Sequence, residues 1–165
     1  MEHVKNIALV AHDNEKRDLV EWVDWNAFQL MNFKLICTGT TGKLVEEALA
    51  KKTDKDHPLK NKIIKLKSGP FGGDQQLGAM IADGKIDILI FFWDPMQPHP
   101  HDVDVKALLR ISVLYNIPTA CNRSTADFLI SSPLMKEKYM PLTRDYSVYI
   151  NRNVDISPEQ IKNEI

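Results

Sequence analysis

Continuous apolar runs and helically spaced apolar positions alternate along this chain. Continuous runs are typical of strands that are buried on both faces of a sheet. We predict such strands at 6–11, 34–37, 63–66, 86–92 and 117–120. The run at 86–92 (Ile-Asp-Ile-Leu-Ile-Phe-Phe) is the strongest of them, and it predicts a central strand.

Between these runs, apolar residues recur every three or four positions, which is typical of helices with one buried face. The spacing predicts helices at 15–30, 44–49, 75–83, 102–116 and 126–130. Within them, Trp22 and Trp25 are interpreted as packing residues, Val113 is expected to face inward, and Ser124 can cap the last helix. The order of elements predicts an α/β fold around a central, mainly parallel, five-stranded sheet.

The length of 165 residues corresponds to one globular domain. We assign residues 1–150 to that domain and 151–165 to a loosely ordered C-terminal tail. The net charge of -1 gives no electrostatic basis for binding nucleic acid or a membrane. The Lys-rich segment 51–62 is interpreted as a solvated surface loop, because no aromatic residue is interleaved to stack on a base. No apolar stretch approaches the roughly 20 residues that a membrane span needs.

Two cysteines, Cys37 and Cys121, lie far apart and match no metal or redox spacing. We expect them to be buried thiols in a reducing compartment, which favours the cytoplasm. No cluster of His, Cys and carboxylate residues has the spacing of a metal site, so no metal is predicted.

The most informative stretch is Ser68-Gly69-Pro70-Phe71-Gly72-Gly73-Asp74, where glycines stand directly before an acidic residue that opens a helix. Glycine allows backbone N–H groups to approach an anion closely, and a helix N-terminus adds free donors. The stretch therefore predicts a phosphate-binding loop with an acid–base group, Asp74, at its edge. The alternative interpretation of Asp74 is a stabilising acid in the first turn of a helix.

A second loop, Thr38-Gly39-Thr40-Thr41-Gly42, also precedes a helix. It resembles part of a nucleotide-binding P-loop, but Cys37 and Leu44 stand where glycine and a magnesium-binding hydroxyl are needed. Its hydroxyls and glycines still suit a single phosphate, and the alternative is an ordinary Thr cap with flexible turns. Two such loops predict a phosphorylated small-molecule substrate.

Further polar residues follow other predicted strands. His12, Asp13 and Lys16 come after the first strand, and His101 and Asp104 come after the fourth. Since ligands of parallel α/β sheets bind at the carboxyl ends of the strands, we expect all of them at one site. The alternatives are a helix cap for Asp13 or Asp104 and a solvated helix face for Lys16.

Together these motifs resemble those of the methylglyoxal synthase family over about Ile7–Tyr149. The segments that carry the resemblance are Ala8–Asp13, Thr38–Gly42, Ser68–Gln76, Phe92–Pro95 and Pro100–Leu108. The resemblance implies a three-layer Rossmann-like domain. It also implies a cytoplasmic homohexamer that converts dihydroxyacetone phosphate to methylglyoxal and inorganic phosphate, without a cofactor. The resemblance further implies that proton abstraction to an enediolate precedes phosphate elimination, that the reaction is a bypass of lower glycolysis, and that phosphate inhibits the enzyme.

The resemblance also implies residue roles. Asp74 corresponds to the carboxylate that removes the proton, His101 to a substrate-binding catalytic histidine, and Asp104 to a second catalytic aspartate. The substrate and phosphate contacts are His12, Lys16, Thr38, Gly39, Thr40, Thr41, Ser68, Gly69 and His101, and Asp13 is added from its place beside His12. Two features depart from the family: the Lys-rich segment is longer, and Arg152 aligns only loosely with an arginine that reaches a neighbouring subunit.

Two other functions remain open at this point. The chain could be a regulatory module that binds a phosphorylated metabolite without converting it. It could also be a phospho-receiver domain with Asp13 and Asp94 as its acidic pocket, although that function explains neither loop.

Overall fold

The protein is described by a computed structural model over residues 1–52, 63–96 and 102–152. Its core is a sheet of five parallel strands. The strands lie in the order β3 (Ile63–Lys65), β2 (Lys34–Cys37), β1 (Asn6–Ala11), β4 (Ile88–Phe92) and β5 (Thr119–Ala120). The predicted parallel five-stranded sheet is confirmed, with β1 rather than the 86–92 strand in its middle and β4 paired on both sides.

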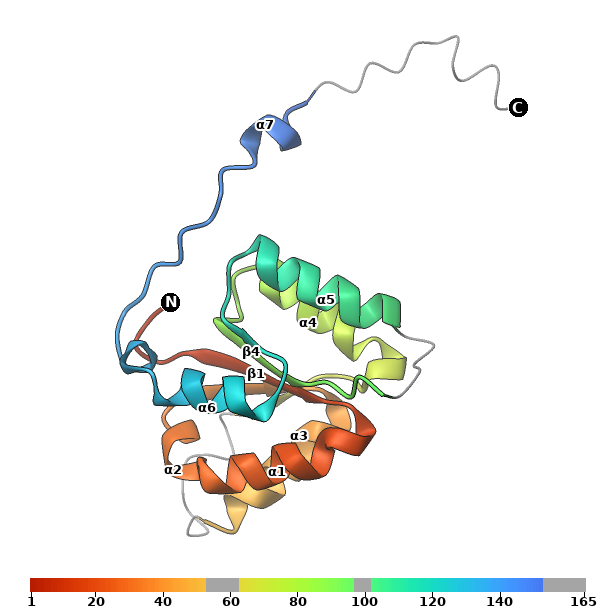
Figure 1. The fold of residues 1–165 in the computed structure, drawn as a ribbon, viewed down its shortest axis with the longest axis vertical. Coiled ribbons are helices and arrows are strands. Elements are labelled where there is room, and N and C mark those ends of the chain that lie inside the picture. Colours follow the sequence, from red (N-terminus) through yellow and green to blue (C-terminus); the bar gives the residue numbers. More distant parts are fainter. Residues whose placement is uncertain (53–62, 97–101, 153–165) are drawn as a thin grey trace, which may run out of the picture.

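Helices cover both faces of the sheet (Figure 1). One layer contains α1 (Lys16–Trp25), α2 (Ala27–Leu30), α3 (Gly39–Ala50) and α6 (Arg123–Ser131), and the other contains α4 (Gly73–Ala82) and α5 (Asp102–Leu114). The short elements are η1 (Asp13–Glu15), η3 (Gly69–Phe71), η4 (Pro133–Met135) and α7 (Ser147–Ile150). No helix within the described ranges is long and apolar enough to cross a membrane.

Strand β1 shows why the layers form. Its side chains alternate between the two faces of the sheet, as the geometry of a strand requires. Ile7 and Leu9 pack into the core under α1, α3 and α6, whereas Ala8 and Val10 pack into the core under α4 and α5. Asn6 is half-buried and the other five residues of β1 are buried, which explains the continuous apolar sequence of the strand.

The strand order separates this fold from a phospho-receiver domain. Receiver domains have the flavodoxin-like order 2-1-3-4-5, whereas this chain has the order 3-2-1-4-5 of a mononucleotide-binding half. The receiver function is therefore wrong.

Three helix predictions need correction at the ends of elements. The helix expected at 15–30 is interrupted at Asn26, whose side-chain amide and backbone N–H both donate to the Trp22 carbonyl. The Thr/Gly loop is itself helical, because α3 already begins at Gly39. The cap of α6 is Asn122, whose side chain accepts from the Thr125 N–H at 2.9 Å, and not Ser124.

Two side chains expected in the core are exposed. Trp25 is 84% exposed and Val113 is 79% exposed. In α5 the buried position is instead Ser112, whose hydroxyl donates to the Leu108 carbonyl at 2.9 Å and so needs no partner outside the helix. The buried stripe of α5 therefore runs through Val105, Leu108 and Ser112.

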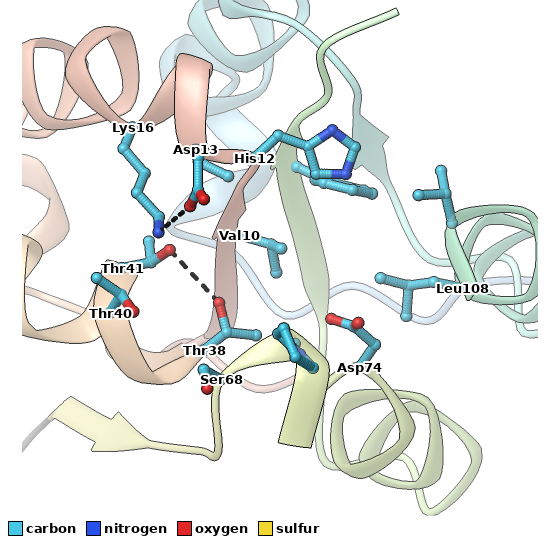
Figure 2. A pocket seen from close by; sticks show the side chains of 15 residues that line it. Val10, His12, Asp13, Lys16, Thr38, Thr40, Thr41, Ser68, Asp74 and Leu108 are labelled. Carbon is cyan, nitrogen blue, oxygen red and sulfur yellow. Dashed lines mark hydrogen bonds and ion pairs between the residues drawn. The ribbon is translucent and has the colours of Figure 1, made fainter. Parts of the chain in front are cut away.

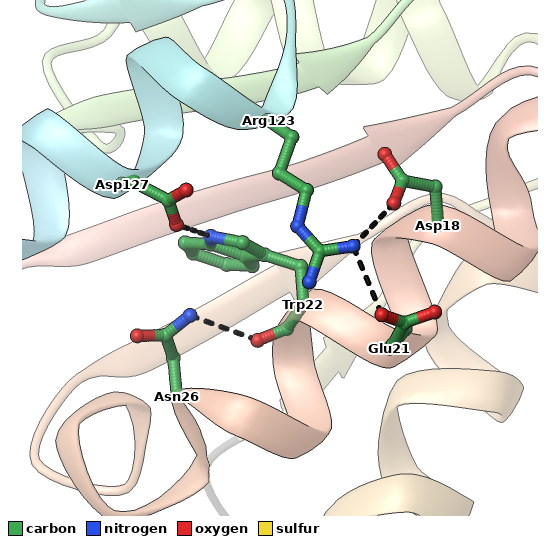
Figure 3. A network of polar contacts seen from close by, with 6 residues as sticks. All are labelled: Asp18, Glu21, Trp22, Asn26, Arg123 and Asp127. Carbon is green, nitrogen blue, oxygen red and sulfur yellow. Dashed lines mark hydrogen bonds and ion pairs between the residues drawn. The ribbon is translucent and has the colours of Figure 1, made fainter.

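A polar network joins α1 to α6 (Figure 3). Arg123 donates to Asp18 at 2.6 Å and to Glu21 at 3.2 Å, and the Asp18 carboxylate is the main cause of the raised pKa of Arg123. The fully buried Trp22 donates its indole N–H to Asp127 at 2.8 Å. These contacts fix α6 against the helix that begins at Lys16.

The N-terminal segment holds the chain that follows η4. The ammonium group of the buried Lys5 donates to the carbonyls of Glu2 and Glu137, and the Tyr139 N–H donates to the Met1 carbonyl at 3.2 Å. Beyond this point the chain continues as an extended arm that ends in α7 (Figure 1). The arm still contacts the domain at Leu142, whose carbonyl accepts from the Asn116 side chain at 2.9 Å.

The buried thiol of Cys37 gives a test of the sheet. Burial raises the pKa of this thiol to about 12, and only thiolates react rapidly with iodoacetamide. We expect alkylation of Cys37 in the native protein at pH 8 to be roughly a thousandfold slower than in concentrated urea. Mass spectrometry of the Cys37 peptide over time measures both rates. Equal rates would contradict the burial of the Cys37 thiol at the end of β2.

Candidate active site

A pocket of about 360 Å³ opens at the carboxyl ends of the strands. Its volume is within the range of small-molecule sites. Three neighbouring strands, β1, β2 and β3, each lead into one of its polar loops, as the sheet order requires. The lining residues are Val10, Ala11, His12, Asp13, Lys16, Thr38, Thr40, Thr41, Ser68, Gly69, Pro70, Asp74, Phe91, Val105 and Leu108.

The loop after β2 provides the N-terminus of α3. Thr38 is the N-cap residue, with extended backbone, but its side chain does not cap the helix. Its hydroxyl instead donates to the Thr41 hydroxyl at 3.4 Å, and both residues are buried. The N–H groups of a first helical turn have no carbonyl four residues back to bind, so this turn offers donors and partial positive charge to an anion.

The loop after β3 packs directly against that helix end. The Gly39 N–H donates to the Lys67 carbonyl at 3.1 Å. A Cβ atom at Gly39 would lie only 3.0 Å from the Ser68 nitrogen, so the two loops meet backbone to backbone. The contact places Ser68 and Gly69 beside Thr40 and Thr41 in the pocket lining.

Asp74 lies in the first turn of α4 and lines the pocket. A Cβ atom at Gly69 would lie 3.2 Å from Asp74 Oδ2, which means that the carboxylate sits directly over the Gly69 backbone. Figure 2 shows this carboxylate across the pocket from Lys16 and Asp13. A carboxylate and an ammonium group thus face the same cavity from opposite sides.

Lys16 is the cation of the pocket. Its ammonium group lies 2.5 Å from Asp13 Oδ1, and its side chain is 20% exposed compared with 85% for Asp13. In Figure 2 the ammonium group lies next to Thr41, at the N-terminal end of α3. Asp13 therefore directs Lys16 toward the helix end that attracts anions.

His12 is held by two contacts. Its Nδ1 accepts a hydrogen bond from the Asp94 backbone N–H at 3.2 Å, and its ring meets Phe91 edge to face at 5.1 Å between centroids. Because Nδ1 is an acceptor, the neutral ring carries its proton on Nε2. The buried Asp94 carboxylate accepts from the Asn14 side chain and the Met96 N–H, so it organises the neighbouring loops.

The structure brings together most of the residues that the sequence predicted. Nine of them line the pocket: Asp74, His12, Asp13, Lys16, Thr38, Thr40, Thr41, Ser68 and Gly69. Gly39 is not in the lining and serves the contact between the loops. His101 lies outside the described residues, as does the side chain of Asp104.

Sequence reasoning missed the apolar side of the pocket. Val10, Phe91, Val105 and Leu108 line it as well as packing in the core. Their spacing indicated only buried strand and helix faces, and nothing local distinguishes a core residue that also borders a cavity. The role of Asp94 in holding His12 and Asn14 was also missed, because it acts across 80 residues or more of sequence.

Comparison with known proteins gives a consistent family. Residues 18–121 match the family model of the MGS-like domain. The chain is 58% identical to methylglyoxal synthase of Maridesulfovibrio salexigens, over 93% of this chain and 100% of the relative. It is 53% identical to methylglyoxal synthase of Oleidesulfovibrio alaskensis, over 92% and 97% of the two chains.

The chain belongs to the methylglyoxal synthase family. A crystal structure of methylglyoxal synthase from Elizabethkingia anophelis superposes with a TM-score of 0.82 at 51% identity, covering 93% of this chain and 95% of the other. The resemblance stated from the motifs and the Rossmann-like fold are thus confirmed. The family model begins at residue 18, so the loop with His12, Asp13 and Lys16 lies outside the matched range.

Among the described residues, no group of three or more His, Cys, Asp or Glu side chains could hold a metal ion. The polar groups of the pocket are an ammonium, hydroxyls, helix N–H groups, an imidazole and the carboxylates of Asp13 and Asp74. This set suits an anionic ligand with a C–H bond to be deprotonated.

The close approach of the start of α4 to the loop after β3 predicts unequal effects of the same substitution within α4. A Cβ atom at Gly73 would lie 2.1 Å from the Lys67 carbonyl oxygen, whereas one at Gly78 meets nothing within 4 Å. We expect Gly73→Ala to lower the free energy of unfolding by about 2 kcal/mol or more. The matched control Gly78→Ala should raise it by about 0.5–1 kcal/mol.

Urea unfolding of both variants measures the difference. Equal free energies of unfolding for the two variants would show that the loop after β3 does not depend on contact with the start of α4.

Proposed function

We propose that this chain is a carbon–oxygen lyase that converts dihydroxyacetone phosphate to methylglyoxal and inorganic phosphate. The observation that carries the proposal is that positive and negative charge stand at opposite ends of one small pocket. Lys16 and the N-terminus of α3 stand at one end, and the Asp74 carboxylate stands at the other. Relatives that are 50–58% identical over most of the chain are named methylglyoxal synthase.

The phosphate of the substrate binds at the Lys16 end. The backbone N–H groups of Thr40 and Thr41 in the first turn of α3 and the hydroxyls of Thr40, Thr41 and Ser68 donate to its oxygens, and Lys16 supplies the countercharge. Asp13 keeps the ammonium group in place through its ion pair at 2.5 Å. A phosphate held there leaves the short carbon chain of a triose pointing toward Asp74.

Asp74 is the general base. It removes a proton from the hydroxymethyl carbon, which the neighbouring ketone makes acidic. The negative charge then grows on the ketone oxygen, where hydrogen-bond donors stabilise it. His12 offers an Nε2–H donor from the pocket wall, and His101 and Asp104 supply the further catalytic groups that the family resemblance implies.

The enediolate decomposes by breaking the C–O bond to phosphate. Its π electrons expel phosphate only when that C–O bond stands out of the enediolate plane, so the loops fix the orientation of phosphate as well as its position. The resulting enol becomes methylglyoxal when its methylene carbon takes up a proton. The substrate carbonyl accepts the electron pair of the broken C–H bond, and phosphate leaves with the pair of the C–O bond, so the reaction needs no cofactor.

The chain works as a homohexamer in the cytoplasm. Inorganic phosphate inhibits it, because this product occupies the N-terminus of α3 where the phosphate group of the substrate binds. The extended arm supports self-association, because Met140, Leu142, Val148 and Ile150 on it are each at least 75% exposed. Apolar side chains on an arm that leaves its own domain are stabilised by a neighbouring surface. The two unpaired cysteines agree with a reducing compartment.

The direct test of the reaction is an assay of the purified chain with dihydroxyacetone phosphate in the presence of a metal chelator. Methylglyoxal and phosphate should appear in equal amounts. Binding of phosphate without its release from the substrate would support a regulatory module instead.

Replacement of the proposed base gives a second prediction. We expect Asp74→Asn to leave the melting temperature close to that of the parent and to lower kcat by about 10²–10⁴-fold. The control is Asp83→Asn at the other end of α4, where the carboxylate is paired with Lys85 at 2.8 Å outside the pocket. Near-normal phosphate release by Asp74→Asn would reject the role.

The position of the Asp74 carboxylate gives a third prediction. A methyl group at Gly69 would press on Asp74 Oδ2 from 3.2 Å without a backbone conflict, since Gly69 has no positive φ. Displacement of a base by a fraction of an ångström is costly, so we expect Gly69→Ala to lower kcat by about tenfold or more.

The free energy of unfolding of Gly69→Ala should stay within about 1 kcal/mol of the parent. Steady-state kinetics and urea unfolding check the two effects separately. An unchanged kcat would show that Asp74 does not act from its place over Gly69.

A further inference from the structure

One side of the pocket is apolar. Val10, Phe91, Val105 and Leu108 line it, and each is at most 7% exposed. The four residues belong to the core beneath α4 and α5, where they pack with Leu77 and Ile81. Protein cores are close-packed, so side chains in this wall have no free space behind them. The wall is therefore a fixed boundary of the site.

Leu108 lies in this wall on the side of the base. Figure 2 shows the Leu108 side chain on the same side of the pocket as the Asp74 carboxylate, with Lys16 and Asp13 on the opposite side. Both Leu108 and Asp74 line the cavity, and their helices α5 and α4 pack against each other. A molecule that extends past Asp74, away from Lys16, meets Leu108.

We propose that Leu108 determines the substrate specificity of this site by closing it beyond the carbon that loses the proton. The inference rests on the proposed function, which binds phosphate at the Lys16 end and presents the hydroxymethyl carbon to Asp74. A hydrogen atom on that carbon fits against the leucine, whereas a carbon substituent would overlap its methyl groups. The site thus accepts a terminal CH₂OH group and excludes branched or longer hydroxyketone phosphates.

The methyl homologue 3-hydroxy-2-oxobutyl phosphate tests this boundary. It keeps the ketone, the hydroxyl group and the phosphate, and it adds one methyl group on the carbon that loses the proton. Removal of that proton and cleavage of the C–O bond to phosphate give an enol. Uptake of a proton at the methylene carbon of this enol yields butane-2,3-dione and inorganic phosphate, so that atoms and charge balance as in the parent reaction.

The experiment compares kcat/KM for the homologue and for dihydroxyacetone phosphate in three proteins. We define the ratio as kcat/KM for the homologue divided by kcat/KM for dihydroxyacetone phosphate. We expect Leu108→Ala to raise this ratio by about tenfold or more, because the substitution relieves a clash with one methyl group in a rigid pocket. The matched control is Leu109→Ala, which removes the same atoms from the neighbouring residue of α5, outside the pocket lining. The control should keep the ratio of the parent chain.

Each outcome decides one question. If the parent chain forms no methylglyoxal from dihydroxyacetone phosphate, the proposed function fails. If the parent is active and the ratio for Leu108→Ala equals that for Leu109→Ala, the role of Leu108 fails while the proposed function stands. Leu108→Val, a smaller truncation, replaces Leu108→Ala if circular dichroism shows that the latter is unfolded, and it should raise the ratio in the same direction.

Discussion

The site depends on one close contact, in which the loop after β3 lies backbone to backbone against the start of α3. The Gly39 N–H donates to the Lys67 carbonyl, and a Cβ atom at Gly73 would lie 2.1 Å from that same carbonyl oxygen. Side chains at either glycine would push the loops apart. Because of this contact, the helix end that attracts an anion and the helix end that carries Asp74 are held in one fixed relation. The proposed phosphate-binding end and the proposed base therefore share one support rather than two independent loops.

The sheet order explains how a chain of this length assembles such a site. Strands β3, β2 and β1 are neighbours, so their three polar loops meet along one half of the sheet edge. The helix α5, which follows β4, closes the other side with apolar residues. The pocket consequently has a polar end that suits phosphate and an apolar end bounded by Val105 and Leu108. This division places the Asp74 carboxylate at the boundary between the two ends.

Sequence patterns predicted the strands and the polar loops well, because both depend on residues that are close together in the sequence. Buried parallel strands appear as continuous apolar runs, and the glycine clusters mark the loops where backbones approach. Features that depend on distant partners were not predictable. Val113, expected to face inward, is exposed while Ser112 is buried, because the direction in which α5 packs is set by α4 and the sheet. Trp25 is exposed because the buried stripe of α1 runs through Leu19, Trp22 and Val23 and leaves position 25 on the outer side of the helix. Leu108 looks like any core leucine until the fold places it beside Asp74.

The central claim concerns geometry, and a crystal structure of the chain with 2-phosphoglycolate tests it most directly. This ligand carries a phosphate and a planar carboxylate that imitates the enediolate. We predict its phosphate at the N-terminus of α3 within hydrogen-bond distance of Lys16, and its carboxylate beside Asp74 over Gly69. A ligand bound in the reverse direction, or an Asp74 side chain turned out of the pocket, would contradict the account.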